Sequence, residues 1–108
     1  MMLVLETIDG GLIVFPSAAS ATGHCELIDV ENGEYEFCDH EGQRYVHSIT
    51  SRTSFFSPGG FTLVPEGTPD TQNALKLIDR ARYLQGKRCN LSSMDELKAF
   101  ISKGKGVS

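Results

Sequence analysis

The sequence predicts an α+β domain in which an antiparallel sheet of four to five strands packs against two or three helices, in the order ββαββ(β)αα. Short β-rich segments fill most of the first 65 residues, and one helical segment separates them. The clearest helical spacing of apolar residues follows residue 68. Strands that precede helices, without regular βαβ alternation, are typical of the α+β class.

The N-terminal segment predicts a β-hairpin. Met2–Ile8 and Gly11–Phe15 are rich in β-branched and large apolar residues. Asp9-Gly10 between them favours a two-residue type I′ turn, because both central residues of that turn need positive φ.

Residues 17–29 predict one helix. Ala18, Ala21, Cys25 and Ile28 recur at helical spacing, and Ser17 is a suitable N-cap. Asn32-Gly33 predicts the stop, because both residues tolerate the left-handed conformation.

A second hairpin is expected from Glu34–Asp39 and Gln43–Thr50, with Glu41-Gly42 as a two-residue loop. This register places Phe37 opposite Val46, and Asp39 opposite Arg44, so that unlike charges meet. Phe61–Pro65 predicts a further strand at a sheet edge, because proline cannot donate to a central ladder.

The last third predicts two helices. The first begins with Thr68 as cap and ends at Gly86, with a buried stripe of Ala74, Leu77, Ile78, Ala81 and Leu84. The second begins at Ser92 or Ser93 and buries Met94, Leu97, Phe100 and Ile101. We expect one domain over residues 1–101 and a fraying tail over 102–108.

Composition narrows the class of protein. Hydrophobic residues make up 40% and charged residues 22%, as in ordinary globular domains. No window approaches the roughly 18 apolar residues of a membrane span, so no membrane association is expected. Three cysteines without a secretory signal favour reduced thiols and a cytoplasmic location.

Charge is distributed unevenly along the chain. Net charge is −4, which argues against nucleic-acid binding. Residues 1–75 contain eleven acids and two bases, whereas residues 76–108 contain eight bases and three acids. The segment from Glu26 to Glu41 contains seven of the fourteen acids and no Lys or Arg. Such a segment would attract a basic partner, although it could equally serve solubility alone.

Catalytic and metal-binding signals are weak. Cys38, His40 and His47 could gather in the second hairpin, but the chain lacks the closely spaced ligand pairs of structural zinc sites. No nucleophile motif surrounds Cys25 or Cys38. Glu31, Glu34 and Glu36 could act as paired carboxylates, but they are more typical of a solvated strand face. We therefore expect no cofactor and no catalytic residue.

Protein binding is the function that the residues favour. Phe55-Phe56, in a Ser/Pro/Gly-rich loop, could anchor an interface or instead plug the end of the core. The predicted partner-binding residues combine this pair with the acidic segment: Glu26, Asp29, Glu31, Glu34, Tyr35, Glu36, Asp39, Glu41, Phe55 and Phe56.

The octapeptide Ile28-Asp29-Val30-Glu31-Asn32-Gly33-Glu34-Tyr35 resembles a stretch found in small, mostly uncharacterised bacterial proteins, some of which resemble immunity proteins of polymorphic toxin systems. The resemblance covers roughly the first 45 residues. It implies a cytoplasmic, non-enzymatic protein that binds and blocks a partner, and it assigns no residue a role.

The sequence thus predicts a non-enzymatic binding module that docks a basic protein through an acidic face, as a toxin-neutralising immunity protein would. Two alternatives stay open. One is a small metal-binding protein or enzyme that uses Cys38, His40 and His47. The other is a homo-oligomeric structural or regulatory protein, in which the acidic face of one copy meets the basic helices of another.

Overall fold

A computed structural model describes residues 1–108 except 53, 57–58, 88–96, 100 and 102–108, and describes only the backbone of residues 85–87. Its elements are β1 (Met2–Glu6), β2 (Gly11–Phe15), α1 (Ala18–His24), α2 (Leu27–Glu31), β3 (Tyr35–Asp39), β4 (Arg44–Ser51), β5 (Gly60–Glu66), α3 (Thr71–Arg80) and β6 (Tyr83–Lys87). The strands form one sheet in the order β5-β4-β3-β1-β2-β6. The α+β class is confirmed.

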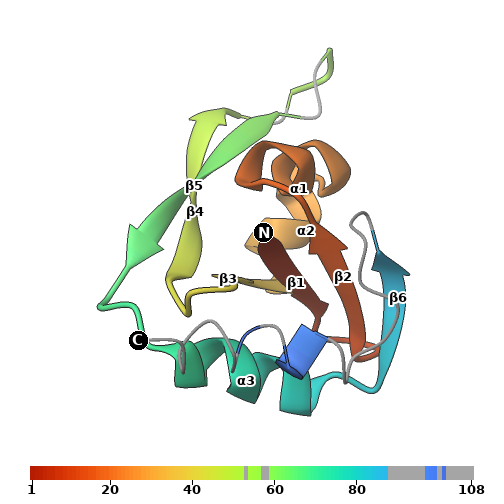
Figure 1. The fold of residues 1–108 in the computed structure, drawn as a ribbon. Coiled ribbons are helices and arrows are strands. Elements are labelled where there is room, and N and C mark those ends of the chain that lie inside the picture. The colour runs from red at the N-terminus through yellow and green to blue at the C-terminus, as the bar shows by residue number, and fades with distance from the viewer. Residues whose placement is uncertain (53, 57–58, 88–96, 100, 102–108) are drawn as a thin grey trace.

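Helices cover both faces of this sheet (Figure 1). Alternate residues of β1 point to opposite faces, so Met2 and Val4 enter one core while Leu3 and Leu5 enter the other. The first core, on the α1 and α2 side, also contains Ile13, Phe15, Ala21, Cys25, Leu27, Val30, Phe37 and Phe61. The second core, on the α3 side, also contains Leu12, Val14, Cys38, Ala74, Leu77, Ile78, Leu97 and Ile101.

The first hairpin forms as predicted, but its loop is longer. Leu5 pairs with Leu12, and the Gly10 N–H donates to the Glu6 carbonyl at 2.9 Å. The loop therefore spans residues 7–10 rather than Asp9-Gly10 alone. The Asp9 carboxylate accepts from the Gly11 N–H at 2.9 Å, which stabilises this wider turn.

The predicted helix over residues 17–29 is two helices. Ser17 is the N-cap of α1, as predicted, and its hydroxyl accepts from the Ser20 N–H at 3.2 Å. Cys25 and Glu26 are extended and separate α1 from α2. This break lets Cys25, Leu27 and Val30 all reach the first core. The stop after residue 31 is confirmed, with Gly33 at φ +74°.

The register predicted for the second hairpin is wrong by one residue. Phe37 lies opposite Tyr45 and Cys38 opposite Arg44. The Asp39 N–H donates to the Gln43 carbonyl at 3.0 Å, so the loop has three residues rather than two. Its last residue, Gly42, has φ +85°, as three-residue hairpin loops require. β5 is the edge strand that Pro65 predicts.

The C-terminal third differs most from its prediction. α3 is capped by Asp70, whose carboxylate accepts from the Gln72 N–H at 3.0 Å, and not by Thr68. Ala74, Leu77 and Ile78 are buried as predicted. The helix ends at Arg80, and β6 follows and pairs parallel with β2, so one pair of the sheet is not antiparallel. Leu84, assigned to the helix stripe, instead lies in β6.

Part of the predicted last helix is visible. Residues 97–99 and 101 are helical, and Leu97 and Ile101 are buried in the second core as predicted. The predicted start at Ser92 or Ser93, the side chains of Met94 and Phe100, and the tail 102–108 lie outside the described residues. No helix within the described ranges has the length and apolarity to cross a membrane.

Candidate functional site

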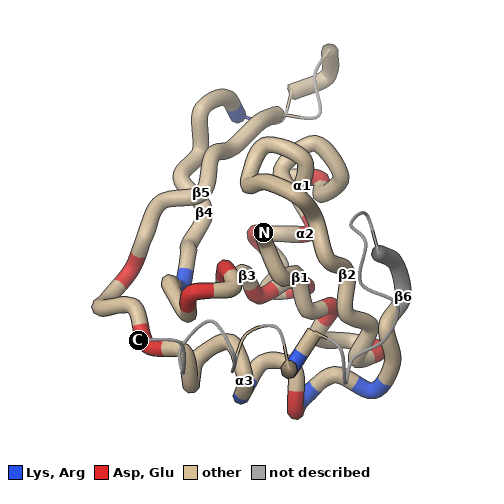
Figure 2. The backbone as a smooth tube through the Cα atoms, in the orientation of Figure 1, with Lys and Arg blue, Asp and Glu red and all other residues tan. Residues whose placement is uncertain are grey.

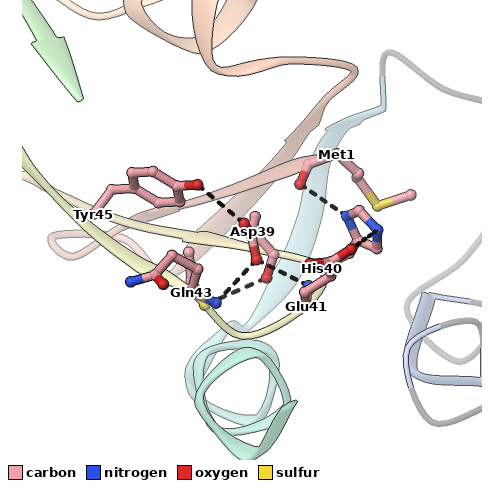
Figure 3. A network of polar contacts seen from close by, with 7 residues as sticks. Met1, Asp39, His40, Glu41, Gln43 and Tyr45 are labelled. Carbon is pink, nitrogen blue, oxygen red and sulfur yellow. Dashed lines mark hydrogen bonds and ion pairs between the residues drawn. The ribbon is translucent and has the colours of Figure 1, made fainter. Parts of the chain in front are cut away.

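The candidate metal ligands of the second hairpin do not converge. Cys38 is buried in the second core, whereas His47 packs edge-on to Phe61 of the first core, with ring centroids 6.5 Å apart. His40 lies in the turn, where its Nδ1 is 3.4 Å from the Met1 carbonyl (Figure 3). In the described part of the chain, no three His, Cys, Asp or Glu side chains form a metal-binding group.

The two described cysteines are structural. Cys25 and Cys38 are buried free thiols in opposite cores. Burial is the main cause that raises the pKa of each thiol to about 12. A thiol needs its deprotonated form to act as a nucleophile, so neither is suited to that role near neutral pH. Cys89 lies outside the described residues.

Two carboxylates of the predicted acidic surface stabilise the fold instead. The Asp39 carboxylate accepts from the N–H groups of Glu41 and Gln43 at 2.9 Å, and from the Tyr45 hydroxyl at 3.1 Å (Figure 3). Glu36 accepts two hydrogen bonds from the Arg80 guanidinium of α3, one of them 2.9 Å long. These bonds hold the pKa of the Glu36 carboxyl below its usual value. The Glu36 charge is therefore compensated within the molecule by Arg80, and the Asp39 carboxylate is occupied by hydrogen bonds of the turn.

Four other acids gather around α2, and we call Glu26, Asp29, Glu31 and Glu34 the α2 acidic cluster. Desolvation and the nearby Asp29 carboxylate raise the pKa of Glu34, which shows that like charges crowd here. The half-buried Tyr35 contacts the first core beside this cluster, and burial and the surrounding carboxylates raise its pKa to about 12. Glu41 is exposed in the β3–β4 turn, away from α2. The predicted acidic face is thus divided between the α2 acidic cluster and the acids of β3 and its turn, and Figure 2 shows acidic segments along several elements.

The aromatic pair lies at the end of a projecting arm. β4 and β5 pair from Arg44 and Glu66 to Ser51 and Gly60, and the loop that joins them extends beyond the helices (Figure 1). Phe55 is 95% exposed and Phe56 is 94% exposed, so they do not plug the core. Their rings contact each other edge to face, with centroids 5.2 Å apart.

An ion pair links this arm to the α2 acidic cluster. Arg52, next to the loop that carries the phenylalanines, lies 3.5 Å from the Glu31 carboxylate. α1 also contacts β5, so the arm rests on the helical layer of the first core. Ile28, 53% exposed on α2, adds an apolar side chain to the cluster. The ion pair therefore places the base of the loop next to the α2 acidic cluster.

A cavity of about 360 Å³ lies on another part of the molecule, between β3, β4 and α3. Arg44 and Val46 of β4 face Asn73, Lys76 and Arg80 of α3 across it. The lining also contains Tyr35 and Glu36, which the sequence predicted as partner-binding residues, whereas Arg44, Val46, Asn73 and Lys76 were not candidates. The spacing of residues 73, 76 and 80 does place them on one side of a helix, beside the buried stripe. The one-residue error in the β4 register concealed that Arg44 shares their face.

Comparison with protein-family models, curated proteins and solved structures gave no match to this chain. Its function is therefore inferred from this geometry.

Proposed function

We propose that this protein is a non-catalytic binding module that docks a protein partner through the arm tip and the α2 acidic cluster. The exposure of Phe55 and Phe56 carries the proposal. Two adjacent phenylalanines in water have an unfavourable hydration free energy, and burial of each stabilises a complex by roughly 1.5–3 kcal/mol. Aromatic side chains at a protruding tip are typical anchors of protein interfaces.

The α2 acidic cluster supports a partner with a basic surface. Four carboxylates with one nearby arginine produce a negative potential around α2. Such a field mainly accelerates association and orients the partner, while apolar anchors supply most of the affinity. An immunity protein that blocks a toxin in the cytoplasm, as the sequence resemblance implies, is the specific form that we propose.

Photo-crosslinking tests the proposal. The amino acid p-benzoylphenylalanine replaces Phe55 or Phe56 in the full chain, expressed in the source cell. The matched control carries it at Ile8, which is 76% exposed in the β1–β2 loop. We expect a partner adduct from positions 55 and 56 but not from position 8. Equal adducts from all three positions, or none from the tip, would contradict the proposal.

Charge reversal tests the contribution of the cluster. Glu26→Lys with Glu31→Lys should lower the adduct yield at low salt, because the basic partner loses its electrostatic attraction. Glu41→Lys, in the exposed β3–β4 turn and outside the cavity lining, is the control and should leave the yield unchanged. An adduct between two copies of this chain would instead identify self-association, the oligomeric alternative.

A further inference from the structure

The β3–β4 pairing ends early and leaves a slot in the sheet. β3 pairs with β1 over its whole length, and β4 pairs with β5 from Arg44 to Ser51. β3 and β4 pair with each other only at Phe37–Tyr45 and Cys38–Arg44. The cavity of about 360 Å³ lies where they diverge, and its lining includes residues of both strands. We call this cavity the β3–β4 slot.

Backbone groups without strand partners face the slot. The Thr7 N–H donates to the Glu34 carbonyl, and the Asp39 N–H donates to the Gln43 carbonyl. Odd residues of β3 therefore direct their backbone groups toward β4, and the even ones toward β1. The same alternation points the backbone of Tyr35 on β3 and of His47 on β4 toward the slot, and Ile49 continues the same edge of β4 beyond the residues that line the slot. Within the described residues, no strand pairs with these three positions on that side.

The two sides of the slot differ in chemistry. On the side of the first core, its wall is aromatic and apolar, formed by Tyr35, Phe37, Tyr45, His47 and Val30. On the α3 side, Arg44, Lys76 and Arg80 line it together with Glu36 and Glu66. Arg80 forms an ion pair with Glu36. Arg44 and Lys76 form no salt bridge with any residue that the structure describes. The α3 side thus carries three cations against two carboxylates, with Arg44 opposite Glu66 in the β4–β5 ladder, and Lys76 and Arg44 are the cations open to an anionic side chain.

We propose that an extended segment of a partner protein adds as a strand along β4 in the slot, with apolar side chains on the aromatic side and Asp or Glu side chains toward Arg44 and Lys76. A strand presents alternate residues to opposite faces, which matches a slot with one apolar and one cationic wall. The unpaired backbone groups supply hydrogen bonds that are independent of sequence. The inference rests on the proposed function for the class of partner, but it uses a surface distinct from the arm tip.

A displayed library of random ten-residue peptides is the probe. Selection on the intact protein should enrich peptides in which apolar and acidic residues alternate. Arg44→Gln and Lys76→Gln should each weaken the selected peptides by about tenfold, because each removes a charge-assisted contact. Arg82→Gln, an exposed arginine that does not line the slot, is the matched control and should leave affinity unchanged. Thermal melts confirm that all three variants are folded.

Amide hydrogen exchange separates strand addition from simple anion binding. On peptide binding, the amides of Tyr35, His47 and Ile49 should become protected by tenfold or more. Enriched peptides without alternation, indifference to both substitutions, or binding that inorganic phosphate reproduces without amide protection would overturn the proposal. Phe55→Ser with Phe56→Ser should leave these peptides bound. Loss of tip crosslinking with retained peptide binding would refute the proposed function alone, and the reverse would refute the slot alone.

Discussion

Gly42 determines both the conformation of the β3–β4 turn and the contact of this turn with the start of α3. Its φ of +85° completes the β3–β4 turn, and its carbonyl accepts from the Asp70 N–H at 3.2 Å and from the Asn73 side chain at 3.1 Å. A Cβ atom built on Gly42 would lie 1.8 Å from the Asp70 carbonyl oxygen. The turn and the start of α3 are thus in contact at a point where only glycine fits.

Gly42→Ala should therefore destabilise the protein by at least about 2 kcal/mol, because positive φ and a backbone clash add together. Gly33→Ala is the matched control. Gly33 has a similar φ of +74° but no atom within 4 Å of a built Cβ, so we expect a loss of roughly 1 kcal/mol. Urea unfolding of both variants measures the difference, and equal losses would show that the contact with Asp70 does not matter.

Residue patterns predict local structure here better than they predict pairing. The Ser17 cap, the stop at Gly33 and the buried Ala74, Leu77 and Ile78 all follow from short-range rules and are confirmed. The β3–β4 register depends on whether the loop has two or three residues, and the Asp39 carboxylate favours three by accepting from the N–H groups of Glu41 in the loop and Gln43 after it. Sequence spacing alone does not reveal that choice, so Arg44 was assigned to the wrong face.

At the scale of elements, β6 was missed because its parallel pairing with β2 is non-local. Residues 83–87 are a short segment next to a strong helix pattern, and their partner β2 lies about 70 residues earlier in the chain. For Phe55 and Phe56 the sequence left two outcomes open, an interface anchor or a plug of the core, and their exposure excludes the second. Their use as a binding surface stays a prediction.

The contact between β3 and α3 depends on the Glu36–Arg80 pair, which is about one-third exposed on the Glu36 side. Because its Arg80 hydrogen bonds hold the folded Glu36 pKa below 4.5, ionised Glu36 favours the folded state above that pH. This contribution to stability is lost as pH falls through the folded pKa.

Because solvent screens the partly exposed pair, we expect Glu36→Gln to lower the free energy of unfolding by only roughly 0.5–1 kcal/mol at neutral pH, and by progressively less in acid. Urea midpoints from neutral pH to about pH 3 measure this. The exposed Glu66→Gln is the control, and a gap that widens in acid would contradict the assignment.

At the scale of the whole molecule, ion pairs within the fold compensate part of the charge asymmetry that the sequence shows. Glu36 pairs with Arg80, Glu31 with Arg52, and Asp79 with Lys98. The first of these pairs joins residues 44 positions apart, so composition could not foresee it. What remains is a smaller negative region around α2, linked to the arm through Arg52, and a cationic wall in the slot that the sequence did not suggest. The two proposed surfaces therefore have opposite charge preferences, and a single partner would need to satisfy both through different segments.

One sheet supports two cores, and this arrangement predicts how the molecule unfolds. β1 and β2 place alternate residues in each core, so neither core can unfold without disrupting the same two central strands.

Ile13→Val in the first core and Ile78→Val in the second each remove one methylene group from a buried side chain. Each should cost about 0.5–1.5 kcal/mol, and the double variant should lose approximately the sum. Urea unfolding followed by far-UV circular dichroism and by NMR methyl signals from both cores should give one coincident transition for every variant. Separate midpoints for the two sets of methyl signals would mean that the α3 layer unfolds independently. Strand addition in the slot would then stabilise β3 and β4 without protecting α3.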